Sequence, residues 1–124
     1  MDGLPGSERV DQGLTAGVFL LDKPAGVTSF GIVRQIRRLL AVKKVGHAGT
    51  LDPFATGLLI VCAGRPATRL IDRFMAGKKR YWGLVQLGVE TETLDPEGKV
   101  VDTAPVPSLT EEQIRGLHNC NSEF

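Results

Sequence analysis

The sequence predicts an α+β fold in which helices flank a mixed, largely antiparallel sheet. Three observations support this class. Short apolar runs that end at glycine or proline recur along the 124 residues, as expected for strands. Segments with apolar residues at helical spacing lie between some of these runs. The two kinds of segment do not alternate strictly, which argues against a purely parallel βαβ sheet.

Two strands and one helix are predicted in the first half of the chain. Gly17–Leu21 is an apolar run closed by the turn sequence Asp22–Gly26, and Leu58–Ala63 is a second apolar run that ends at a glycine. A helix is expected between them. Either Thr28 or Ser29 can serve as its N-cap, because both side chains carry a hydroxyl that can accept a hydrogen bond from the first helical turn.

This helix is expected to be amphipathic. Its apolar residues recur at helical spacing and are Ile32, Val33, Ile36, Leu39 and Leu40. The basic residues lie off that stripe and are Arg34, Arg37 and Arg38. We therefore expect an apolar face turned toward the core and a basic outer side.

Residues 46–57 show neither helical nor strand periodicity. The segment contains three glycines and Pro53, which predicts a structured loop. After it and the following strand, Pro66 is expected in the first turn of a helix that runs to about Met75. Alternating side chains predict a strand near residues 80–88.

Residues 90–98 form a polar connection to a short predicted strand at residues 99–101. Farther along, Thr110 and Gln113 have capping-box spacing and predict a helix through Leu117. We expect residues 1–16 to form a mobile polar lead-in, residues 17–117 to form the domain, and residues 118–124 to be a tail without a periodic pattern.

Composition narrows the function classes. No apolar run approaches the roughly 20 residues needed to span a bilayer, and the N-terminus lacks the features of a signal peptide. The two cysteines, Cys62 and Cys120, do not require a disulfide, so a reducing cytoplasm is the simpler interpretation. Residues 23–80 carry twelve lysines and arginines against Asp52 and Asp72. That excess fits a polyanionic partner, although a solvated surface balanced by acidic residues elsewhere is an equal alternative.

Asp52 is the first candidate for catalysis. It is one of the two acids in the basic segment and lies in the predicted loop, where a carboxylate can act as a nucleophile or a base. The alternative is that Asp52 caps a turn before Pro53, and for an isolated Leu-Asp-Pro sequence that alternative would be favoured. His47 lies five residues earlier, but no serine or cysteine nucleophile motif accompanies the pair.

The sequence gives little support for a metal site or a nucleotide-cofactor site. The two histidines and two cysteines lack metal-ligand spacing, and no glycine-rich nucleotide motif is present, so neither a metal nor a cofactor is expected. Tyr81 directly follows Lys78, Lys79 and Arg80. An aromatic ring beside cations suits base stacking next to phosphate contacts, although packing in the core is the commoner use of a tyrosine in a strand.

Five sequence blocks, taken in order, favour the functional interpretation of Asp52 and Tyr81 over the structural one. They are residues 17–26 (GVFLLDKPAG), 44–59 (KVGHAGTLDPFATGLL), 64–69 (GRPATR), 79–81 (KRY), and 87–88 with 91–98 (LG and TETLDPEG). From about Gly17 to Leu117 the chain resembles the TruB-type tRNA pseudouridine synthases. The resemblance implies a pseudouridine synthase-like catalytic domain, present here only in its N-terminal portion.

The resemblance also implies residue roles. Asp52 would be the catalytic aspartate, and Tyr81 the ring that stacks on the target uridine. His47 would support the flipped-out nucleotide and fill its place, with Lys79 and Arg80 also contacting the substrate. Three further residues are expected to support the catalytic loop without contacting the substrate themselves: Lys23, Gly49 and Thr50.

The implied substrate is the T-arm stem-loop of tRNA, modified at uridine-55 without a metal or cofactor. A cytoplasmic enzyme that is monomeric at full length is expected. Family members continue well past residue 124 and supply further active-site residues and an RNA-binding domain. The competing hypothesis is therefore a non-catalytic RNA-binding fragment, which would bind tRNA without converting it.

Overall fold

The computed structural model describes residues 15–120, and residues 118–120 by their backbone alone. Most of the expected lead-in and the last four residues of the expected tail lie outside this range. The chain divides into two compact units, residues 1–80 and residues 81–124. None of the helices in residues 15–120 combines the length and the hydrophobicity of a membrane span.

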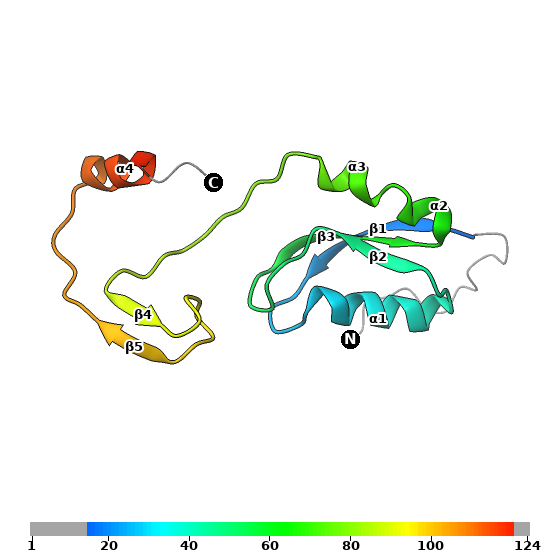
Figure 1. Cartoon of the computed structure of the whole chain (residues 1–124), viewed down its shortest axis with the longest axis horizontal. Coiled ribbons are helices and arrows are strands. Elements are labelled where there is room, and N and C mark those ends of the chain that lie inside the picture. The colour runs from blue at the N-terminus through cyan, green and yellow to red at the C-terminus, as the bar shows by residue number, and fades with distance from the viewer. Residues whose placement is uncertain (1–14, 121–124) are drawn as a thin grey trace. The chain divides into compact units, whose positions relative to one another are not determined.

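The first unit contains a three-stranded antiparallel sheet (Figure 1). Strand β1 (Gly17–Lys23) and strand β2 (Val45–Ala48) both pair with the central strand β3 (Gly57–Ala63). The predictions for β1 and β3 are therefore confirmed. All strand pairs in the described part of the chain are antiparallel, which confirms the α+β class with a largely antiparallel sheet.

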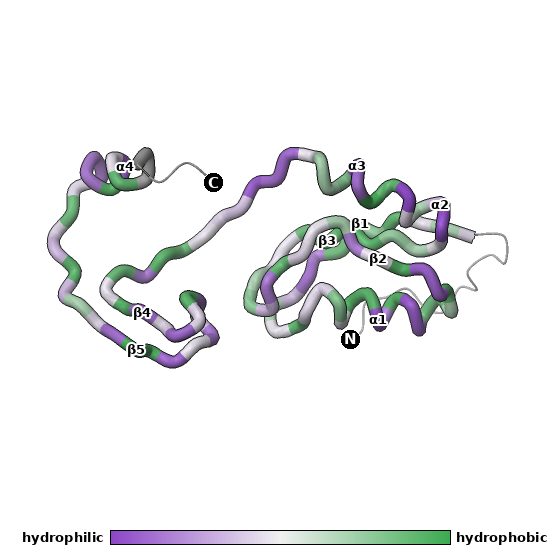
Figure 2. The backbone as a smooth tube through the Cα atoms, viewed as in Figure 1, coloured by the Kyte–Doolittle hydropathy of each residue, from purple (hydrophilic) through white to green (hydrophobic). Residues whose placement is uncertain are grey.

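Helix α1 (Ser29–Leu40) covers one face of this sheet. Its N-cap is Thr28, whose Oγ1 accepts a hydrogen bond from the Gly31 amide at 2.9 Å. Hydrophobic and hydrophilic residues alternate along α1, as its amphipathic sequence requires (Figure 2). Its C-cap is Ala41, which takes a left-handed conformation with φ 51°.

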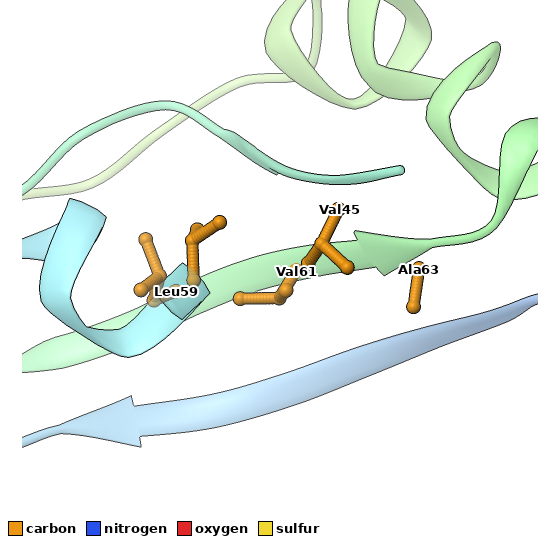
Figure 3. Close-up of a cluster of buried hydrophobic side chains, with 5 residues drawn as sticks. Val45, Leu59, Val61 and Ala63 are labelled. Atoms are coloured by element: carbon orange, nitrogen blue, oxygen red, sulfur yellow. The ribbon is translucent and has the colours of Figure 1, made fainter. Parts of the chain in front are cut away.

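The core lies between α1 and the sheet. Its buried residues are Val33, Val45, Leu59, Val61 and Ala63, with partly buried Phe19, Leu21, Ile32, Ile36, Leu40 and Val42 packed around them. Figure 3 shows buried side chains of this core, among them Leu59, Val61 and Ala63 of β3 and Val45 of β2. Two details of the predicted helix were wrong. Leu39 is exposed, and Arg37 is partly buried, since its guanidinium donates to the Val45 carbonyl at 3.4 Å.

The other face of the sheet carries two short helices, α2 (Arg65–Thr68) and α3 (Ile71–Met75). A Cβ placed on Gly46 would lie 3.0 Å from Cδ1 of Ile71, so α3 packs on the side of β2 opposite the core residue Val45. One continuous helix to Met75 was predicted. The helix is instead broken at residues 69–70, where the Leu70 amide bonds to the carbonyl three residues back.

The second unit contains a two-stranded antiparallel sheet of β4 (Val89–Thr91) and β5 (Val100–Thr103), followed by α4 (Glu111–Cys120). The predicted capping box is confirmed. The Gln113 amide donates to Thr110 Oγ1 at 3.3 Å, and the Thr110 amide donates to Gln113 Oε1 at 2.9 Å.

Two predictions about strands were wrong. Residues 46–48 belong to β2, because pairing with β3 imposes an extended backbone on a segment whose composition indicated a loop. Residues 80–88 form no strand. The two sheets of the described residues provide no partner for them, and Trp82 and Leu84 are 92% and 102% exposed.

Candidate active site

The segment Gly49–Thr56, which we call the Asp52 loop, connects β2 to β3. It begins at Gly49, whose φ of 81° lies in the left-handed region that favours glycine. His47, at the end of β2, places Nδ1 2.7 Å from the Gly49 carbonyl oxygen. Because a carbonyl can only accept, Nδ1 must be the protonated nitrogen of this contact. The histidine therefore fixes the entry to the loop.

Lys23 holds the loop after Asp52. Its side chain is 1% exposed, and Nζ donates to the carbonyls of Pro24 at 2.7 Å, Val27 at 2.7 Å and Pro53 at 3.1 Å. The Gly26 amide donates to the same Pro53 carbonyl at 2.7 Å. All three ammonium protons thus bind backbone, and the turn after β1 is tied to the residue that follows Asp52.

Ser29 holds the loop before Asp52. Its side chain is 3% exposed, and Oγ accepts from the Leu51 amide at 3.0 Å and donates to the Leu51 carbonyl at 3.2 Å. From the sequence alone, Ser29 is only a possible helix cap. Nothing in local sequence could have shown this contact, because its partner is 22 residues away.

Asp52 itself lies on the surface between these two anchor points. Its backbone carbonyl accepts from the Ala55 amide at 2.9 Å, which closes a turn. Within residues 15–117, neither a hydrogen bond nor an ion pair engages its carboxylate. The turn is therefore closed by backbone groups, and the carboxylate projects from a loop that is fixed on both sides.

The remaining predicted site residues divide between the two units. Lys79 lies over the start of the loop, since its Cε would be 3.7 Å from a Cβ on Gly49, and its Nζ donates to the Met75 carbonyl at 2.9 Å. Thr50 and Arg80 are exposed. Tyr81 opens the second unit and is 69% exposed. The structure thus gathers Lys23, His47, Gly49 and Lys79 at the Asp52 loop, and the roles of all the predicted site residues, Tyr81 included, stay predictions.

Comparison with known proteins identifies the family to which this chain belongs. Residues 37–121, which include β2, the Asp52 loop and β3, match the family described as TruB family pseudouridylate synthase (N terminal domain). The chain belongs to the TruB family. The match covers more than half of the chain and confirms the family to which the sequence blocks pointed.

Individual TruB relatives agree with this assignment. The tRNA pseudouridine synthase B of Desulfotalea psychrophila is 62% identical over 104 residues, which cover 84% of this chain and 42% of the relative. That of Protochlamydia amoebophila is 49% identical over 100 residues, covering 80% of this chain and 37% of the relative. The chain therefore spans about two fifths of the length of these relatives.

Solved structures also match over part of the chain. An H/ACA RNP bound to a substrate RNA containing 2'-deoxyuridine matches with a TM-score of 0.44 and 46% sequence identity. That match covers 46% of this chain and 18% of the solved one. An archaeal box H/ACA sRNP Nop10–Cbf5 complex matches with a TM-score of 0.43 and 48% identity, covering 45% and 18%.

Proposed function

We propose that the protein is a tRNA pseudouridine synthase that isomerises uridine-55 in the T-arm loop, with Asp52 as its catalytic carboxylate. The observation that carries this proposal is the Asp52 loop. Its backbone is anchored at Leu51 and at Pro53, it lies within the family match, and its carboxylate is exposed and has no hydrogen-bond partner among residues 15–117.

The reaction rearranges bonds within one nucleotide. The N1–C1' glycosidic bond of uridine breaks, the base rotates, and a C5–C1' bond forms. C5 then gives up its hydrogen as a proton, and N1 takes up a proton, so the product is an isomer of the substrate. No electrons enter or leave and no group is donated, so the balance of the reaction requires neither a redox partner nor a group-transfer cofactor.

Asp52 has the chemistry that this sequence of bonds needs. A carboxylate near the anomeric carbon can stabilise or trap the sugar after glycosidic cleavage, as in glycoside hydrolysis, or it can remove a proton from the sugar. Both roles require the carboxylate to meet the ribose at a fixed angle. The anchored backbone on either side of Asp52 supplies that constraint.

The substrate base must leave its stack before Asp52 can reach the sugar. We propose that Tyr81 stacks on the flipped uridine and that His47 fills the vacated space, which offsets the cost of unstacking of a few kcal/mol. Lys79, which lies beside Gly49, and Arg80 would bind the phosphates that flank this nucleotide.

The remaining proposals concern the partner and its setting. The relatives are named for tRNA, and residues 23–80 carry an excess of ten positive charges, which supports the T-arm stem-loop as the ligand. A cytoplasmic, monomeric full-length enzyme follows as part of the same proposal. A protein that binds tRNA without turnover is the second candidate, and the observation that favours it is the same positive excess of residues 23–80, which supports RNA binding but does not by itself require catalysis.

Tritium release tests the proposal. Formation of the C5–C1' bond expels the hydrogen on C5, so unmodified tRNA transcribed with 5-tritiated uridine releases tritium only when the product forms. We would assay the 124-residue chain and a chimera in which its 104 matching residues replace the corresponding region of the Desulfotalea enzyme. Release from normal tRNA, and none from tRNA with cytidine at position 55, is expected.

Two outcomes separate the candidates. If the chimera releases tritium while the chain binds tRNA without release, the site is competent and the chain alone is the RNA-binding protein of the second candidate. If the chimera is inactive while the unaltered Desulfotalea enzyme is active under the same conditions, the proposed function is wrong.

A further inference from the structure

Ser29 has a bonding pattern that helix capping does not explain. The N-cap of α1 is already Thr28, whose hydroxyl accepts from the Gly31 amide. Ser29 is a small polar side chain buried to 3% exposure, and burying a hydroxyl without a partner costs free energy. Its hydroxyl instead uses both its donor and its acceptor on Leu51.

The two bonds constrain the peptide that leads into Asp52. The Leu51 carbonyl belongs to the same planar peptide unit as the Asp52 amide, so its bond to Ser29 Oγ fixes the plane that ends at the Asp52 Cα. The bond from the Leu51 amide fixes the preceding plane. On the other side, the Pro53 carbonyl is held by Lys23 and Gly26. The peptide unit directly after Asp52 is held through its own carbonyl, which accepts from the Ala55 amide at 2.9 Å. The backbone is therefore anchored in the peptide units before Asp52 and in the two units after it.

The orientation of the carboxylate depends on these anchors. Its side chain is exposed, and within residues 15–117 it has no hydrogen-bond partner that could aim it. The backbone sets the direction of the Cα–Cβ bond from which the carboxylate projects, so a shift of the anchored peptide units shifts the carboxylate. A displacement of about 1 Å in a reacting group can cost roughly 100-fold in rate.

We infer that Ser29 is a positioning residue for catalysis: its hydroxyl grips Leu51 and thereby aims the Asp52 carboxylate at the ribose. This inference rests on the proposed function of Asp52. Ser29, the first residue of α1, would thus affect the reaction through Asp52 without contacting the substrate itself. A role in folding alone is the alternative.

Exchange of the Leu51 amide proton tests the contact without an activity assay. In the 124-residue chain, Ser29→Ala should speed hydrogen exchange at Leu51 at least tenfold, while the amides paired between β1 and β3 keep their protection. Thr28→Ala is the matched control, because it removes a hydroxyl one residue away and weakens the same helix end, but it leaves Leu51 bound. Equal exchange at Leu51 in Ser29→Ala and the unaltered chain would overturn the inference.

Kinetics then separate positioning from folding. In the chimera, Ser29→Ala should lower the rate constant of tritium release at saturating tRNA by about 10- to 100-fold, with the dissociation constant for tRNA unchanged within twofold. Thr28→Ala should change neither. If Ser29→Ala does not fold, Ser29→Cys takes its place, because the thiol has a similar size but bonds only weakly.

The outcomes are distinct from those for the proposed function. If Ser29→Ala is fully active, or if Thr28→Ala loses as much activity, the inference about Ser29 is wrong. The proposed function still holds in that case, provided that Asp52→Asn is inactive. An inactive unaltered chimera overturns both.

Discussion

Replacing Lys23 by methionine should destabilise the first unit by about 2–4 kcal/mol. Methionine keeps the length of the side chain and removes the ammonium that binds three backbone carbonyls. The Pro53 carbonyl keeps the Gly26 amide as a partner, but the carbonyls of Pro24 and Val27 lose the donor they have in this structure.

The magnitude follows from these two carbonyls. Leaving a fully buried acceptor without a partner costs about 1–3 kcal/mol, so two fully buried carbonyls would cost about 2–6 kcal/mol. Relief of the desolvation of a buried ammonium works in the opposite direction, but removing one partner of a buried charged contact is still destabilising on balance. Water reaches the exposed turn around Pro24, which moves the expected total toward the lower end of the range.

The assay must report on the first unit alone. Trp82 and Tyr81, the single tryptophan and the single tyrosine, lie in the second unit, so fluorescence would follow the wrong part of the chain. Urea unfolding followed through amide exchange at β3 reports the first unit directly. Lys78→Met is the matched control, because Lys78 is exposed. A loss below about 0.5 kcal/mol in Lys23→Met, equal to that of the control, would refute the argument.

Three further predictions follow from other parts of the chain. Leu59→Ala should cost about 2–5 kcal/mol in the same assay, whereas Leu58→Ala on the opposite face should cost under about 1 kcal/mol, because the two side chains are 1% and 64% exposed. A hydrogen bond from Thr93, and after it bonds from backbone amides, lower the pKa of Asp95 from its ordinary value of 3.8. The ionised carboxylate therefore stabilises the β4–β5 hairpin at pH values above 3.8, and this stabilisation is lost as the pH falls through the lower pKa of the folded state. An NMR titration midpoint of Asp95 at or above 3.8 would contradict this. Alanine at all of Lys78–Arg80 should weaken tRNA binding and flatten its dependence on the logarithm of salt concentration by about 2–3 units; an unchanged slope would remove these residues from the RNA interface.

The sequence predicted those elements that local patterns determine. β1 and β3 are apolar runs, and α1 and α4 begin at hydroxyl caps with helical periodicity behind them. The four residues of β2 are too few for a periodic signal, and their strand geometry comes from pairing with β3. The alternation at residues 80–88 is a true strand pattern, but a strand forms only against a partner, and the described sheets offer none.

The candidate site divides in the same way. Asp52, His47 and Gly49 lie close together in the chain, so a motif can show them together. Lys23 is suspected only through the resemblance to the TruB family, and its three carbonyl partners could not be derived from sequence. Ser29 was missed because a contact across 22 residues depends on how α1 and the Asp52 loop fold against each other.

The rate of tritium release before and after Asp52→Asn tests the central claim most directly. Asparagine keeps the size of the side chain and removes the charge, so the backbone anchors at Leu51 and Pro53 should persist. Measured in the chimera with protein in excess over tRNA, the rate constant should fall at least about 1,000-fold, as expected for loss of a group that reacts with the substrate. A rate constant within tenfold of the unaltered chimera would show that Asp52 is not the catalytic residue.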